Sequence, residues 1–175
     1  MNQQQKRIIM KSFISSQFGY CSLVWMFHSR KLNHRINRIH ERALRIVYSD
    51  YVSSFDELLL KDNSVNIHTR NIQNLAIELY KVVNKLSPPI MNKIFILKDS
   101  LNHSSRKIFQ TSNIRTSAYG LESLRHIGPK IWDMIPKELK DLESLKVFTD
   151  NVKQWTPSNC PCKLCKSYIK NVGYL

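Results

Sequence analysis

Three cysteines stand close together near the end of the sequence, with the spacing Cys-x-Cys-x-x-Cys. They are Cys160, Cys162 and Cys165. Thiolates at such short spacing can fold around one zinc ion, and a structural zinc site holds four cysteine or histidine ligands. No His or Cys follows Cys165 in the sequence, so the fourth ligand must come from Cys21, from a distant histidine or from another chain. The alternative is three reduced thiols on a flexible tail.

A second group of residues that could have a function is a run of cations between residues 29 and 48. On a helix, at about 100° per residue, these cations share one face. Several cations on one face can neutralise a phosphate backbone, and arginine adds bidentate phosphate contacts. We therefore predict a face that binds RNA or DNA without sequence specificity, formed by Lys31, Arg35, Arg38, Arg42 and Arg45. The alternative is a solvated helix face whose charge only prevents aggregation.

Catalytic patterns are scarce in this sequence. It has no adjacent pair of aspartates to hold the two metal ions of a polymerase centre. His40-Glu41 begins like a zinc-protease helix, but Leu44 stands where the second histidine should be. Only 4 glycines occur, and no Gly-x-Ser-x-Gly sequence is present, which argues against phosphate loops and nucleophile elbows. We expect that the chain on its own is not an enzyme.

The overall composition agrees with a basic, folded protein. The 175 residues are 42% hydrophobic and carry 27 Lys and Arg against 13 Asp and Glu, a net charge of +14. Such a charge attracts phosphate polymers or acidic membrane surfaces, and we favour nucleic acid because the apolar faces suit a shared core. No apolar run approaches the ~20 residues that span a bilayer, and Lys11 interrupts the apolar N-terminal stretch. We therefore expect an intracellular protein with reduced cysteines and no membrane partner.

The elements that must position these groups are predicted to be helices. Residues 6–27 read as mostly helical, with a break at Gly19. A helix from Ser29 to Tyr48 is the clearest prediction, because six apolar residues fall within an arc of about 100° beside the cations. The six are Leu32, Ile36, Ile39, Ala43, Ile46 and Val47. A capping box at Ser54 and Glu57 predicts a short helix after it.

The second half of the chain is predicted to be less regular. Apolar spacing predicts a helix from Ile67 to Leu86, ended by Pro88-Pro89. A brief helix follows, and then an extended stretch with short strands near Ile108-Phe109 and Ile114. Gly128-Pro129 is expected to start a helix that Pro136 ends, and a last amphipathic helix carries Leu145, Phe148, Val152 and Trp155.

Together these elements predict a mainly α protein. We expect a small helical bundle with an extended, short-stranded middle segment and a Cys-rich C-terminal tail. The predicted divisions are 1–98, a helical thumb-like region; 99–126, an extended linker; 127–156, a C-terminal helical region; and 157–175, the tail. The three tryptophans, Trp25, Trp132 and Trp155, sit in apolar patterns, and we expect all three to be mostly buried.

Three stretches of the chain resemble one known family. They read SQFGYCSLVW at 16–25, HERALRIVY at 40–48 and, after YG at 119–120 and SLR at 123–125, GPKIWDMIP at 128–136. The chain resembles the C-terminal, post-palm end of jockey-like non-LTR retrotransposon reverse transcriptases, over nearly its whole length, and the Cys-rich tail looks like the end of such proteins. The family usually has Gly-Pro-x-x-Trp-Asn-x-x-Pro, where this chain has Asp133, and Asn-Tyr-Cys-Pro, where it has Gly19-Tyr20-Cys21-Ser22.

This resemblance implies a fragment of an RNA-directed DNA polymerase that lacks the catalytic palm. The family's aspartate pair has no matching position, so no catalytic residue carries over. The resemblance implies RNA or DNA as partner, contacts with other retroelement protein domains, and a nuclear location if the parent element's role is retained. Two alternatives stay open: a catalytically inert helical interaction module that packed on the missing domains, and a zinc-dependent nucleic-acid-binding tail.

Overall fold

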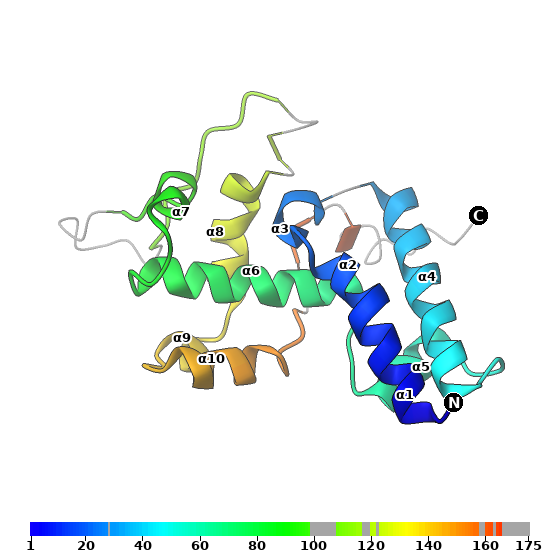
Figure 1. The fold of residues 1–175 in the computed structure, drawn as a ribbon. Coiled ribbons are helices and arrows are strands. Elements are labelled where there is room, and N and C mark those ends of the chain that lie inside the picture. Colours follow the sequence, from blue (N-terminus) through cyan, green and yellow to red (C-terminus); the bar gives the residue numbers. More distant parts are fainter. Residues whose placement is uncertain are drawn as a thin grey trace. The chain divides into compact units, whose positions relative to one another are not determined.

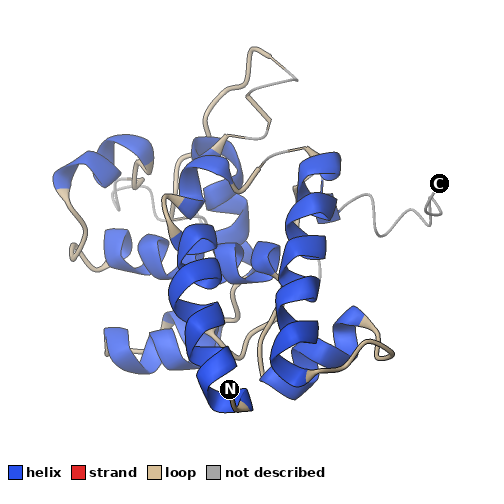
Figure 2. Cartoon of the chain, turned by 45° about the vertical axis from the view of Figure 1, so that its right-hand side comes forward, coloured by secondary structure: helices blue, strands red, loops and turns tan. Residues whose placement is uncertain are grey.

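The computed structural model describes residues 1–27, 29–98, 108–116, 120–121, 123–157, 160–162 and 164–165, and these are mostly helical (Figures 1 and 2). This confirms the predicted mainly α fold. Within the described residues no strand forms, and an isolated antiparallel bridge joins Leu97 to Phe109. The strands predicted near Ile108-Phe109 and Ile114 therefore reduce to this single bridge. Parts of the predicted linker and most of the predicted tail lie outside the described residues.

The chain divides into two compact units, Met1–Asn71 and Ile72–Leu175. The first unit begins with α1 (Gln3–Ile9), the π-helix η1 (Met10–Ser15), α2 (Ser16–Gly19) and α3 (Ser22–Trp25). The predicted helical stretch and its break at Gly19 are confirmed. The left-handed residue at the break is Cys21, with φ of 46°.

Helix α4 (Arg30–Tyr48) starts where the side chain of Ser29 accepts the backbone N–H of Leu32, and ends at Ser49 in the left-handed region. Helix α5 (Phe55–Asp62) has the predicted capping box, in which Ser54 and Glu57 exchange hydrogen bonds. Residues of η1, α4 and α5 form one apolar core: Met10, Ala43, Leu44, Val47, Leu58 and Leu59.

A polar contact at the edge of this core ties three helices together. The Arg7 Nε atom donates to Asp62 Oδ1 at 2.7 Å, and the Tyr48 hydroxyl donates to the same oxygen at 2.9 Å. Asp62 is only 4% exposed, so its carboxylate depends on these two donors for the hydrogen bonds that water would otherwise supply. The contact fixes α1 and α4 against the end of α5.

Helix α6 (Ile67–Val83) is continuous through the division between the units. It confirms the predicted helix, and it ends before Lys85, whose φ is 58°. The rest of the second unit comprises α7 (Pro89–Ile94), α8 (Leu124–Met134), α9 (Lys137–Lys140) and α10 (Leu145–Val152). Among the described residues, no helix is both long and apolar enough to cross a membrane.

Aromatic rings organise the core of the second unit. Tyr80 stacks on Phe148 with ring centroids 4.1 Å apart, and Phe109 meets both Phe95 and Trp132 edge to face. Trp132 is only 2% exposed, as predicted. Trp25 and Trp155 are neither exposed nor fully buried, so of the three tryptophans expected to be mostly buried, Trp132 is buried most completely.

Helix α8 starts earlier than predicted, at Leu124 rather than at Gly128-Pro129. Its buried residues Ile127 and Ile131 lie four apart on one face, so burying that face favours helix on both sides of the proline. Pro129 therefore sits inside the helix, where its missing N–H leaves one backbone carbonyl of the preceding turn without its helical bond.

Candidate metal centre and basic helix face

The three tail cysteines lie together in the second unit. Cys160 and Cys162 are buried, Cys165 is half-buried, and none of the three forms a disulfide. The backbone N–H of Cys165 points at Cys162 Sγ, with 3.4 Å between nitrogen and sulfur. An N–H aimed at sulfur favours the thiolate form that metals bind.

One histidine joins these thiols. His68 lies on the first turn of α6, and one nitrogen of its ring and the three sulfur atoms all lie within 4.8 Å of one another. His68 is 7% exposed. The cluster of His68, Cys160, Cys162 and Cys165, which we call the Cys3His cluster, can hold a metal ion.

Hydrogen bonds among the thiols of this cluster oppose their ionisation. The hydrogen bond with Cys162 is the main cause that raises the pKa of Cys160, to about 12, and burial adds to it. Side-chain hydrogen bonds with Cys160 and Cys162 likewise raise the pKa of Cys165. Neighbouring thiolates in a buried site repel each other, and a divalent cation compensates that repulsion.

A second contact anchors the start of the tail to the same helix. The Gln73 side-chain amide donates to the backbone oxygen of Lys153 at 3.1 Å and to that of Trp155 at 2.8 Å. Gln73 lies five positions after His68 on α6, so one helix carries both the hydrogen-bond anchor and the histidine of the cluster.

The sequence leaves three sources for the fourth ligand, namely Cys21, a distant histidine or another chain, and the residue that joins the three cysteines is a distant histidine, His68. Cys21, the in-chain cysteine among these candidates, is exposed and is not part of the cluster. No spacing rule could single out His68, because it is far from Cys160 in the sequence and next to an ordinary apolar helix pattern. Its position is set by how the tail returns to α6.

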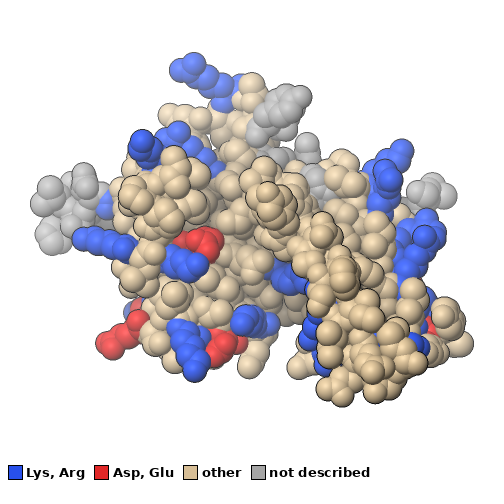
Figure 3. Space-filling view, in the orientation of Figure 1, with Lys and Arg blue, Asp and Glu red and all other residues tan. Residues whose placement is uncertain are grey.

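The predicted basic residues occupy two different environments on α4. Lys31, Arg35, Arg38 and Arg42 are exposed, and Figure 3 shows Lys and Arg side chains along the outer edge of this helix. Within the part of the chain that the structure describes, these four cations form no ion pair with an acid. We call them the basic face of α4.

Arg45 is engaged differently. Its Nη2 atom lies 2.7 Å from Glu41 Oε1, and its Nη1 atom donates to the backbone oxygen of Asp50 at 3.4 Å. Glu41 is the only acid between residues 29 and 48, so this pair removes that acid from the basic face and holds Arg45 close to the protein.

The buried face of α4 is rotated relative to the predicted apolar arc. Ile36, Ala43 and Val47 are buried as expected, together with the polar residues Asn33 and His40. The remaining members of the arc are exposed, at 41%, 49% and 56%: Leu32, Ile39 and Ile46. Ile39 lies among the arginines, in an open pocket of about 270 Å³ lined by Arg35, Arg38, Ile39 and Arg42.

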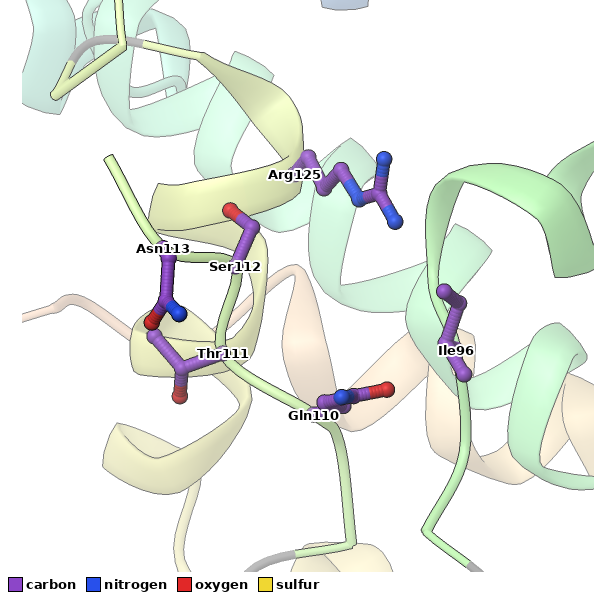
Figure 4. A pocket seen from close by; sticks show the side chains of 6 residues that line it. All are labelled: Ile96, Gln110, Thr111, Ser112, Asn113 and Arg125. Atoms are coloured by element: carbon purple, nitrogen blue, oxygen red, sulfur yellow. The ribbon is translucent and has the colours of Figure 1, made fainter. Parts of the chain in front are cut away.

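A second pocket, of about 290 Å³, lies in the second unit (Figure 4). Its lining is Ile96, Gln110, Thr111, Ser112, Asn113 and Arg125. The polar side chains come from the extended stretch after the bridge residue Phe109, and Arg125 comes from the first turn of α8. The pocket offers hydroxyl and amide groups and a cation, and these lining residues include no carboxylate or histidine that could act as a general base.

No family model, curated protein or solved structure matches this chain.

Proposed function

We propose that this chain is a nucleic-acid-binding module without catalytic activity. In this proposal the basic face of α4 contacts the phosphate backbone of RNA or DNA, without reading sequence. One observation carries the proposal: three arginines of one helix face, Arg35, Arg38 and Arg42, are exposed and meet in one open pocket. Free guanidinium groups can turn to phosphate oxygens without first breaking an internal ion pair.

The proposed parent is the C-terminal part of a non-LTR retroelement reverse transcriptase. The resemblance of the three sequence blocks to that family supports this origin, and the absence of an aspartate pair supports the lack of polymerase activity. The place of action in this proposal is the nucleus, where such an element copies its RNA. Purified protein given primed template, nucleotides and Mg²⁺ should extend nothing, and processive extension would overturn the proposed origin.

Binding is tested by reversing the charge of the three arginines. In an Arg35→Glu, Arg38→Glu, Arg42→Glu variant, affinity for RNA and duplex DNA should fall together, irrespective of sequence. The wild-type dissociation constant should rise steeply with salt, because neutralising phosphates releases counterions.

A matched control separates the helix face from overall charge. Lys93, Lys137 and Lys146 are exposed on α7, α9 and α10, and reversing them to Glu changes the net charge equally. If this control loses as much affinity as the α4 variant, binding follows net charge alone. If the α4 variant keeps wild-type affinity, the basic face is only solvated, and the interaction-module alternative is favoured.

We also propose that the Cys3His cluster binds zinc. One nitrogen and three sulfur ligands suit zinc, which prefers four such ligands in a tetrahedral arrangement. The support is the convergence of the four ligand atoms within 4.8 Å. Protein purified without chelators should contain about one zinc per chain, and a ratio near zero after supplying zinc would refute this proposal.

A further inference from the structure

We infer that His68 is the fourth ligand of a closed, structural zinc centre that fastens the tail to α6. The inference rests on the zinc binding proposed above and adds that the site is closed and structural, and that His68 is required for it. Four atoms from two distant parts of the chain would then bind one ion: a ring nitrogen from α6 and three sulfurs from residues 160–165.

The distances fit this assignment. In a tetrahedral site with Zn–S near 2.3 Å and Zn–N near 2.0–2.1 Å, neighbouring ligand atoms lie roughly 3.5–3.8 Å apart. The four atoms here are within 4.8 Å of one another. Closing the remaining ~1 Å requires only small side-chain rotations, since the backbone already brings the four residues together.

The burial of the cluster favours a structural site over a catalytic one. A catalytic zinc keeps a position for water or substrate, whereas a structural zinc has four protein ligands. Exposure of the ligands is 7% for His68, 2% for Cys160 and 0% for Cys162. Leu164, which lies between the last two cysteines in the sequence, is also 2% exposed. Cys165 is half-buried, and four protein ligands leave no open coordination position.

The role of the zinc site follows from the other contacts that hold the C-terminal segment on α6. Between α10 and Cys160, the described residues reach α6 through two hydrogen bonds, from the Gln73 side chain to the backbone oxygens of Lys153 and Trp155. Two neutral hydrogen bonds contribute far less to stability than a structural zinc site does. Zinc would therefore decide whether residues 160–165 stay on α6.

The other candidates for the fourth ligand do not meet these conditions. Cys21 is exposed and absent from the cluster. His40 and His126 are buried elsewhere, His40 against the Phe55 ring and His126 beside Lys130 Nζ. Among the described histidines and cysteines, the four residues of the cluster are the ones that converge.

Cobalt substitution in the full-length chain tests the ligand assignment. Co²⁺ in a tetrahedral site gives intense d–d absorption, and its thiolate ligands give charge-transfer bands. His68→Ala should weaken zinc binding by more than about 100-fold, since even the loss of an outer-shell partner costs about 10–100-fold. His68→Cys should restore tight binding, with the d–d bands shifted to those of a four-thiolate site.

Matched controls and a second readout make the outcomes distinct. Cys21→Ser and His34→Ala, both at exposed positions, should leave zinc affinity and the cobalt spectrum unchanged. With zinc, the cysteines should resist alkylation, and His68→Ala should expose them while circular dichroism shows intact helices. If wild-type protein binds one zinc but His68→Ala keeps its affinity and spectrum, the assignment is overturned and zinc binding stands. If wild-type protein binds no zinc, both proposals fail.

Discussion

The ring of Phe95 occupies the space where a side chain at position 128 would begin. A Cβ atom added to Gly128 would overlap Phe95 Cε1, well inside van der Waals contact. Phe95 is 1% exposed, so its ring has no free space to turn into. The glycine of the Gly128-Pro129…Trp132 block is thus required by close approach of α8 to an aromatic ring, and Trp132 lies in the same aromatic cluster through Phe109.

Replacing this glycine should destabilise the second unit. Gly128→Ala is expected to lower the free energy of unfolding by about 1–3 kcal/mol, the usual cost of overpacking a tight core, although alanine is the better helix former. Urea denaturation followed by tryptophan fluorescence measures it. Gly19→Ala is the control, because a Cβ there meets nothing within 4 Å. Equal stability of the Gly128→Ala variant and wild type would mean that Phe95 can move aside.

Trp132 should be the most costly of the three tryptophans to truncate. It is 2% exposed, contacts Phe109 edge to face at 5.8 Å, and has Lys140 Nζ 5.6 Å from its ring centroid. Trp132→Ala should cost ~3–5 kcal/mol, measured by thermal or urea unfolding with circular dichroism. The same truncation at half-buried Trp25 or Trp155 should cost clearly less, and a ranking with Trp132 last would contradict the described core.

Local signals in the sequence predicted most helices correctly. Ser29 and Ser54 accept the N–H bonds expected of helix caps, and the apolar spacing of α6 and α10 matches their helices. These features depend on residues within one or two turns of each other, so the sequence contains the information directly.

Predictions that depended on distant contacts were less accurate. The buried face of α4 includes Asn33 and His40, which an apolar pattern counts as solvent-facing, so the predicted arc was rotated. No pattern in the sequence indicates that His68 is a ligand, because the thiols reach His68 only where the tail folds back onto α6. Polar residues that are buried by tertiary contacts escape any reasoning based on periodicity.

The buried His40 should make stability depend on pH. Burial is the main cause that lowers the pKa of His40 to about 4, and the nearby positive charge of Arg70 adds to it, while Asp62 opposes it. Between pH 6.5 and 4 the unfolded chain therefore binds a proton that the folded chain does not. Stability must fall as the pH falls through this window, by about 2 kcal/mol at pH 5 for this one group.

Urea denaturation at pH 7.5 and pH 5 measures the effect. His40→Gln should remove most of the difference, since glutamine does not titrate. His34→Gln is the control, because His34 is exposed on the same helix, and it should keep the difference. The carboxyl groups have unfolded pKa values near 4, so they contribute little between pH 6.5 and 5. A wild-type stability that stays constant between pH 7.5 and 5 would show that His40 gains a proton without cost.

The two environments of arginine on α4 predict different salt dependence. Arg38 is exposed on the basic face, so Arg38→Ala should lower the slope of log affinity against log salt by about 1, the effect of one lost phosphate contact. Arg45 is held by Glu41 at 2.7 Å, and breaking that pair to reach a phosphate would cancel much of the gain. Arg45→Ala should therefore change the slope by much less, in fluorescence-anisotropy titrations with a labelled RNA at several salt concentrations.

Glu41→Gln would free Arg45, and it should raise affinity and steepen the slope. If Arg45→Ala lowers the slope as much as Arg38→Ala does, the contact surface includes all five cations predicted from the sequence, and the ion pair with Glu41 opens when nucleic acid binds.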